Sequence, residues 1–189
     1  QILPEHKVLG LNKVGSGFEL PFSHAGQRGL YRADRVLLAT GGNSGAGDWL
    51  RNMGHTVIDG VPALFTFKIN DPRLEGLAGV SVASTQVTLG SSSLRQEGAT
   101  LITHWGLSGP AVLKLSSWGA RELAKCQYST RLLVNWLHPR KYAEVRKEIQ
   151  LMCDGPEATR ACGNTPMFGL PARLWQKLLG PLAPHAWRN

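Results

Sequence analysis

A short apolar run that ends in two glycines, residues 36–42, constrains the fold of this chain more than any other feature. Its first four residues, 36–39, are typical of a strand that is buried on both faces of a parallel sheet. Gly41 and Gly42 permit a turn with positive φ and a close approach of the backbone to a ligand. Because ligands in open α/β sheets lie beyond the carboxyl ends of strands, we predict that Thr40, Gly41 and Gly42 contact a cofactor. An ordinary strand followed by a glycine turn is the alternative that these residues alone leave open.

The residues ahead of this run predict a small antiparallel meander. Two strands are expected at residues 7–14 and 18–23, around a glycine turn at 15–17, and a third at residues 29–33. The sequence Gly-x-Gly-x-x-Gly, which normally places a dinucleotide pyrophosphate at a helix N-terminus, occurs nowhere in the 189 residues. The chain also begins at Gln1, directly in this meander. We therefore expect an internal piece of a longer protein.

Beyond residue 60 the pattern predicts an α+β fold, in which a small antiparallel β barrel or curled sheet is joined to a helical subdomain. Residues 61–138 are expected to be mainly β with one helix, and residues 139–189 to be helical. Alternating apolar residues predict strands at 65–69, at 80–89 with a bulge near Ser84, at 94–103 with a break at Gly98, and at 131–137. Periodic apolar residues and terminal glycines or prolines predict helices at 48–53, 109–123, 139–152 and 170–179.

The sequence Thr-His-Trp-Gly-Leu-Ser-Gly-Pro at 103–110 precedes the second of these helices. Ser108 is predicted to cap the helix, with Pro110 in its first turn. The N–H groups at the helix start could hold an anion or a carbonyl oxygen, and His104 could titrate or orient a substrate, so His104 and Ser108 are candidate substrate-binding residues. A well-capped structural corner, in which His104 bonds to the backbone, is the alternative. A Ser–His hydrolase pair is not indicated, because the spacing Gly-x-Ser-x-Gly is absent here.

Composition and charge argue against several classes of function. The net charge of +8 does not predict nucleic-acid binding, because the basic residues are spread out, without a run of five like charges or an aromatic-interleaved basic motif. Cys126, Cys153 and Cys162 lack paired metal-ligand spacing, so we predict reduced thiols, a cytoplasmic location and no metal site. No apolar stretch is long enough to span a bilayer, and no membrane contact is expected.

Five short signatures in the same order resemble the BaiN-like NAD(P)/FAD-dependent oxidoreductases, a bacterial family that includes proteins similar to aminoacetone oxidase. The meander before the first signature is also similar to that of the two-dinucleotide-binding (Rossmann-like) flavoproteins. The signatures are Ala-Thr-Gly-Gly at 39–42, Gly-His-Thr-Val at 54–57, Pro-Ala-Leu at 62–64, Leu-Glu-Gly-Leu-Ala-Gly-Val at 74–80 and Thr-His-Trp-Gly-Leu-Ser-Gly-Pro at 103–110.

The resemblance implies FAD as cofactor, NAD(P)H as a candidate electron donor and a small-molecule substrate. It implies that residues 1–60 are the end of the first FAD-domain segment and that residues 61–189 are an inserted substrate domain. The loop after Gly42 is shorter than in the family, with Asn43 where a lysine is expected. No residue is assigned as a catalytic acid or base, and the oligomeric state is not predicted. Two alternatives are a non-catalytic binding module that has lost the cofactor and a basic β domain that binds nucleic acid.

Overall fold

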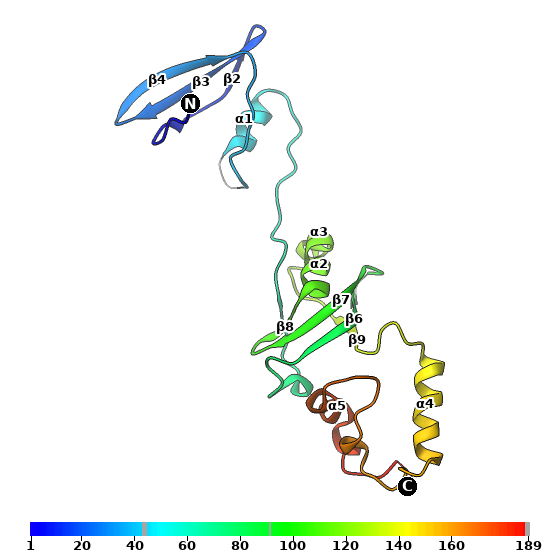
Figure 1. The fold of residues 1–189 in the computed structure, drawn as a ribbon. Helices are drawn as coiled ribbons and strands as arrows, with labels where there is room; N and C mark the ends of the chain where they lie inside the picture. Colours follow the sequence, from blue (N-terminus) through cyan, green and yellow to red (C-terminus); the bar gives the residue numbers. More distant parts are fainter. Residues whose placement is uncertain (43–44, 91, 188–189) are drawn as a thin grey trace. The chain divides into compact units, whose positions relative to one another are not determined.

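The computed structural model describes residues 1–42, 45–90 and 92–187, and the chain divides into two compact units, residues 1–60 and 61–189 (Figure 1). In the N-terminal unit, local antiparallel pairing dominates, and Leu11 and Ala46 are its buried apolar residues among those described. The C-terminal unit contains a second sheet, most of the helices and one large hydrophobic cluster.

Strand β3 is the centre of the N-terminal sheet, because β1 and β2 pair along one of its edges and β4 along the other. The β3–β4 hairpin turns at Ala25 and Gly26, whose φ angles of 49° and 78° are those of a two-residue type I′ turn. The predicted meander is confirmed, although its first strand is interrupted at residues 9–11. The strands are β1 (Lys7–Val8), β2 (Asn12–Val14), β3 (Gly17–His24) and β4 (Gln27–Ala33).

Residues 36–39 do not form the buried strand that the sequence predicts. They belong to no strand, and Leu37 is 90% exposed. A strand buried on both faces needs hydrogen-bonded neighbours on each side, and the described part of the chain places none beside this run. The prediction is wrong for these 189 residues by themselves, because apolar residues indicate a tendency to be buried but do not supply the partner.

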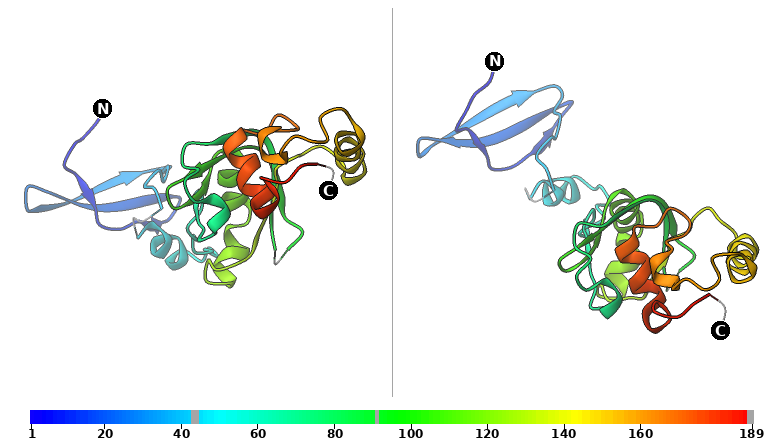
Figure 2. Two further views of the ribbon diagram at one scale, coloured as in Figure 1. Left: turned by 90° about the horizontal axis from the view of Figure 1, so that it is seen from below. Right: turned by 60° about the horizontal axis from the view of Figure 1, so that its bottom comes forward.

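The C-terminal unit is built on an antiparallel sheet of strand order β5-β8-β7-β6-β9, which curls into a half barrel (Figures 1 and 2). Its register shifts between Val82 and Thr85, which confirms the bulge predicted near Ser84. The break predicted at Gly98 is wrong, because β7 continues through this residue and Gly98 pairs with Thr85. The strands are β5 (Phe67–Lys68), β6 (Ser81–Leu89), β7 (Arg95–Thr103), β8 (Gly106–Ser108) and β9 (Leu132–Asn135).

Two helices replace the single helix predicted at 109–123, because the chain breaks at Gly119. A Cβ atom on Gly119 would lie 2.7 Å from Leu89 Cδ1 and 2.9 Å from the Leu115 carbonyl oxygen, so the packing leaves no room for a side chain. The other three predicted helices are confirmed with small shifts at their ends, and no described helix has the length and apolar content needed to cross a bilayer. The helices are α1 (Ala46–Asn52), α2 (Pro110–Trp118), α3 (Ala120–Lys125), α4 (Tyr142–Asp154) and α5 (Ala172–Leu179), with short 3₁₀ turns η1 (Pro72–Leu74), η2 (Cys162–Asn164) and η3 (Gly180–Leu182).

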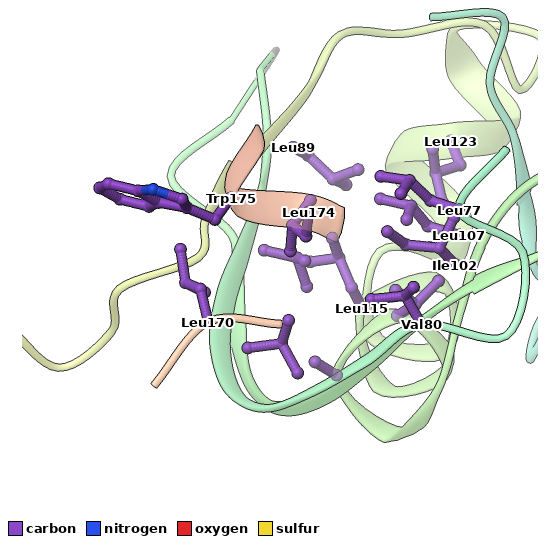
Figure 3. Packing of buried hydrophobic residues seen from close by; sticks show 14 residues of the cluster. Leu77, Val80, Leu89, Ile102, Leu107, Leu115, Leu123, Leu170, Leu174 and Trp175 are labelled. Atoms are coloured by element: carbon purple, nitrogen blue, oxygen red, sulfur yellow. The ribbon is translucent and has the colours of Figure 1, made fainter. Parts of the chain in front are cut away.

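One cluster of buried apolar residues joins the curled sheet to α2 and α5 (Figure 3). Leu174 of α5 lies among these side chains, together with Leu115 of α2 and Ile102 of β7. Trp175 is also buried, and its indole N–H donates to the Cys162 carbonyl oxygen at 2.8 Å. This hydrogen bond satisfies the polar edge of a buried ring, so α5 is held to the sheet and to η2 at the same time.

Candidate functional site

The predicted cofactor residues lie together on one hollow of the N-terminal unit. Thr40, Gly41 and Gly42 line this glycine-rich hollow, which has a volume of about 520 Å³ and is completed by α1 and by residues 57–60. Gly41 has a φ of 73°, which strongly favours glycine, and a Cβ atom built on Gly41 or on Gly42 would meet no described atom within 4 Å. The backbone of both residues is therefore open on the side where a side chain would stand.

Two carboxylates neutralise the arginine of this hollow. The Arg51 guanidinium donates to Asp48 Oδ1 at 2.7 Å and also to Asp59, and these hydrogen bonds raise its pKa. Arg51 thereby fastens the segment after α1 to the helix itself. Since the guanidinium is already paired, we do not expect it to hold a phosphate. The hollow offers a ligand the backbone of Gly41 and Gly42, with Thr40 beside them. Asn43, where the family has a lysine, lies outside the described residues.

The structure separates the two candidate substrate residues of the C-terminal unit. His104 is exposed at the tip of the β7–β8 hairpin, next to Trp105, and Ser108 is the half-buried last residue of β8. The Ser108 side chain does not cap α2, so that prediction is wrong. Gly109 occupies the cap position with a φ of 99°, and a Cβ atom there would lie 2.8 Å from the Ala99 carbonyl oxygen. The chain passes so close to β7 at Gly109 that only a glycine fits between the end of β8 and the start of α2.

Substitutions in this hairpin are expected to have small effects on stability. Ser108→Ala should change the free energy of unfolding by less than about 0.5 kcal/mol, whereas loss of a true N-cap costs about 1 kcal/mol. His104→Gln should also leave stability nearly unchanged, because the ring is exposed at a turn. Urea unfolding followed by circular dichroism measures both. A loss above about 1 kcal/mol in the Ser108 variant would restore the capping role.

A second hollow, lined by aromatic and polar side chains, lies in the C-terminal unit between β5 and the segment before β9. This aromatic hollow has a volume of about 690 Å³, and Phe65, Phe67 and Tyr128 form part of its wall. The Phe65 ring meets the rings of Phe67 and Tyr128 edge-on, with centroids 5.7 and 5.6 Å apart. The alternation of Phe65 and Phe67 is visible in the sequence as a strand, but no sequence pattern places Tyr128 beside them.

Comparison with known proteins identifies the family to which the curled sheet and its helices belong. Residues 61–186, about two thirds of the chain, match the family described as HI0933-like protein barrel and H2TH domain. The 3-dehydro-bile acid delta(4,6)-reductase of Clostridium scindens is 34% identical over 168 residues, or 82% of this chain. The ribosomal RNA dihydrouridine synthase of Escherichia coli is 33% identical over 123 residues, and that of Haemophilus influenzae is 31% identical over 98 residues, or 59% and 47% of this chain.

The fold is that of an α+β domain with a half barrel and accompanying helices. The chain belongs to the HI0933-like, or BaiN-like, family of flavoproteins, as the resemblance in its sequence predicts. It spans 39% of the length of the Clostridium relative, 29% of the Escherichia relative and 24% of the Haemophilus relative.

Proposed function

We propose that these 189 residues are a segment of an FAD-dependent oxidoreductase. In this proposal residues 1–60 contribute one contact to FAD, and residues 61–189 form the substrate domain. The observation that carries the proposal is the common location of Thr40, Gly41 and Gly42 on the glycine-rich hollow of a flavoprotein family member. The bound group would lie along this backbone, where a side chain would otherwise stand.

The residues of the hollow fit an uncharged part of the cofactor better than its pyrophosphate. The described backbone at Gly41 and Gly42 is unobstructed, and Arg51, the cation among the described residues that line the hollow, is paired with Asp48 and Asp59. A pyrophosphate normally binds at a helix N-terminus that follows a glycine fingerprint, and this sequence has no such fingerprint. The proposal therefore assigns the pyrophosphate to chain outside these 189 residues.

The flavin would supply the redox chemistry by transferring hydride, and the protein would supply position and a substrate surface. Thr40 and Gly41 would fix one edge of the cofactor, and the C-terminal unit would orient the substrate. The names of the relatives are consistent with a reduction, since a reductase adds hydrogen to its substrate and dihydrouridine contains two more hydrogen atoms than uridine. We therefore propose a reaction that reduces an unsaturated organic substrate.

Flavin retention tests the assigned contact. In the whole protein that contains this segment, Gly41→Val should lower the affinity for FAD about tenfold, because a β-branched residue at a φ of 73° is strained and its side chain fills the open space. The ratio of visible flavin absorbance to protein, measured on the purified protein, reports this loss. Circular dichroism should show that the C-terminal unit stays folded.

Gly15→Val is the matched control, because Gly15 has a φ of 59° but lies in a hairpin turn outside the hollow. It should carry a similar backbone strain and keep its flavin. Full flavin occupancy in the Gly41 variant would remove this strand end from the cofactor site. Tight, saturable binding of FAD by residues 1–189 alone would contradict the assignment of the pyrophosphate site to other parts of the chain.

A second candidate is an oxidoreductase that acts on RNA. Two relatives are named ribosomal RNA dihydrouridine synthases, and the C-terminal unit holds fifteen Lys and Arg against eight Asp and Glu, nearly all of the chain's surplus of +8. Such a surplus attracts phosphates in a salt-dependent way. Binding of a labelled RNA by residues 1–189 that weakens steeply with added salt would favour this candidate over a small free substrate.

A further inference from the structure

The wall of the aromatic hollow is fixed by hydrogen bonds from the core. The Phe65 N–H donates to Ser116 Oγ at 2.9 Å, and the Ser116 hydroxyl donates to the Leu113 carbonyl oxygen at 2.9 Å. Ser116 is fully buried in α2, so this bridge ties the chain ahead of β5 to the most buried helix of the unit. Phe67 is held by its pairing with Leu107 of β8. The two phenyl rings are therefore positioned before any ligand arrives, which lowers the entropy lost on binding.

The third ring of the hollow is presented by an unusual backbone. Gln127 and Tyr128 have φ angles of 52° and 59°, a left-handed conformation that non-glycine residues rarely adopt in succession. Hydrogen bonds hold this turn, from the Tyr128 N–H to the Leu123 carbonyl oxygen at 2.7 Å and from the Gln127 N–H to the Ala124 carbonyl oxygen at 3.1 Å. These two bonds are the pair that defines a Schellman motif, in which the chain ends α3 by turning into the left-handed conformation. Here this turn places an aromatic ring against Phe65.

The polar side of the hollow carries one positive charge. Lys68 follows Phe67 in β5, lines the hollow and is exposed. No described acidic residue forms an ion pair with it, whereas Arg73, a few residues further on, is paired with Asp71. Ser129 also lines the hollow and offers a hydroxyl group. An apolar ring wall beside an unpaired ammonium group and a hydroxyl is complementary to an amphipathic anion.

We propose that the aromatic hollow binds a ring-bearing organic carboxylate, with its apolar ring system against Phe65, Phe67 and Tyr128 and its carboxylate on Lys68. The volume of about 690 Å³ lies in the range of pockets that bind ligands of this size. The further assignment of this ligand as the substrate to be reduced rests on the proposed function. Binding itself requires no flavin, so it can be measured on these 189 residues.

Titration calorimetry with deoxycholate, kept below its micelle-forming concentration, tests the proposal on residues 1–189. Saturable binding is expected, and the uncharged amide of deoxycholate should bind about tenfold more weakly because it lacks the charge. Lys68→Gln should cause a similar loss for deoxycholate and none for the amide. Tyr128→Asn should weaken both ligands about tenfold, and asparagine is chosen because it tolerates the left-handed backbone.

Matched control variants are available on other surfaces of the same unit. Lys114→Gln changes an exposed lysine of α2, and Tyr142→Asn changes an exposed tyrosine at the start of α4, and neither residue lines the hollow. Both variants should bind deoxycholate as the unmodified chain does. No saturable binding, binding that Lys68→Gln and Tyr128→Asn leave unchanged, or tighter binding of uridine monophosphate than of deoxycholate would each overturn the proposal.

These outcomes are separable from those of the flavin test. A whole protein that purifies without flavin, while residues 1–189 bind deoxycholate through Lys68, would overturn the proposed oxidoreductase and leave the ligand site. A flavin-containing protein whose aromatic hollow does not bind deoxycholate would overturn the ligand site and leave the proposed oxidoreductase.

Discussion

Replacing Gly106 with alanine is expected to unfold the edge of the C-terminal sheet. Gly106 pairs with Lys68 of β5 and has a φ of 152°. A Cβ atom at this position would lie 2.1 Å from the Phe67 carbonyl oxygen and 2.7 Å from the Ile69 backbone nitrogen. Both obstacles are backbone atoms, so the clash cannot be relieved by a rotamer change. We expect a loss of more than about 4 kcal/mol in the free energy of unfolding, measured by urea denaturation.

Gly98→Ala separates the clash from the backbone strain. Gly98 has a comparable φ of 142°, but a Cβ atom there would be 3.6 Å from its nearest neighbour, the Ala111 nitrogen, which is an ordinary contact. This variant should lose only about 1–2 kcal/mol. Equal unfolding midpoints for the two variants would contradict the close approach of β5 and β8. Because β5 carries Phe67 and Lys68, the Gly106 variant should also lose the aromatic hollow.

Sequence reasoning succeeded where structure depends on local periodicity. The strand pattern of residues 80–89 contains its own irregularity near Ser84, and the structure has the bulge there. The helix at 170–179 is flanked by a proline and a glycine that act within a few residues, and α5 (Ala172–Leu179) lies inside that range. In both cases the residues that determine the element are those that form it.

The predictions failed where contacts with distant parts of the chain determine the local structure. Gly119 interrupts the helix predicted at 109–123 because Leu89 of β6 packs against its backbone, and no local pattern shows that contact. Ser108 has the right side chain for a cap, but the approach of β7 makes Gly109 the cap residue. The left-handed backbone at Gln127 and Tyr128 likewise could not be predicted from the sequence, since neither residue is a glycine or an asparagine.

The candidate site was predictable only in its glycine-rich part. Residues 40–42 are recognised by composition and order, and the structure places all three on one hollow, but their contact with FAD stays a prediction. The strand expected before them is not formed, because a parallel strand requires neighbours that these 189 residues do not provide there. His104 and Ser108 are close in sequence, but one lies at a hairpin tip and the other at a strand end.

Leu174→Ala is expected to produce the second large loss of stability, because this single side chain joins α5 to the sheet core. Leu174 is fully buried in the main cluster, among Ile102, Leu107 and Leu115 (Figure 3). Removing a buried leucine side chain costs the transfer free energy and leaves a cavity, together about 2–5 kcal/mol. The exposed Leu182, which is 62% accessible, is the matched control, and Leu182→Ala should cost less than about 0.5 kcal/mol.

The same experiment tests whether the helical segment is part of the folding unit of the sheet. If α5 and the sheet unfold together, urea denaturation of Leu174→Ala should give one transition, with the same midpoint by Trp fluorescence and by circular dichroism. Trp175 of α5 contributes to this fluorescence, since its ring is buried and its N–H is bonded to Cys162, although the chain has six tryptophans in all. A variant that keeps the midpoint of the unmodified chain would contradict the docking of α5. The folding unit of the sheet would then consist of the half barrel with α2 and α3. The shape of the aromatic hollow would not depend on residues beyond 138, because every residue assigned to it lies between Pro62 and Leu132.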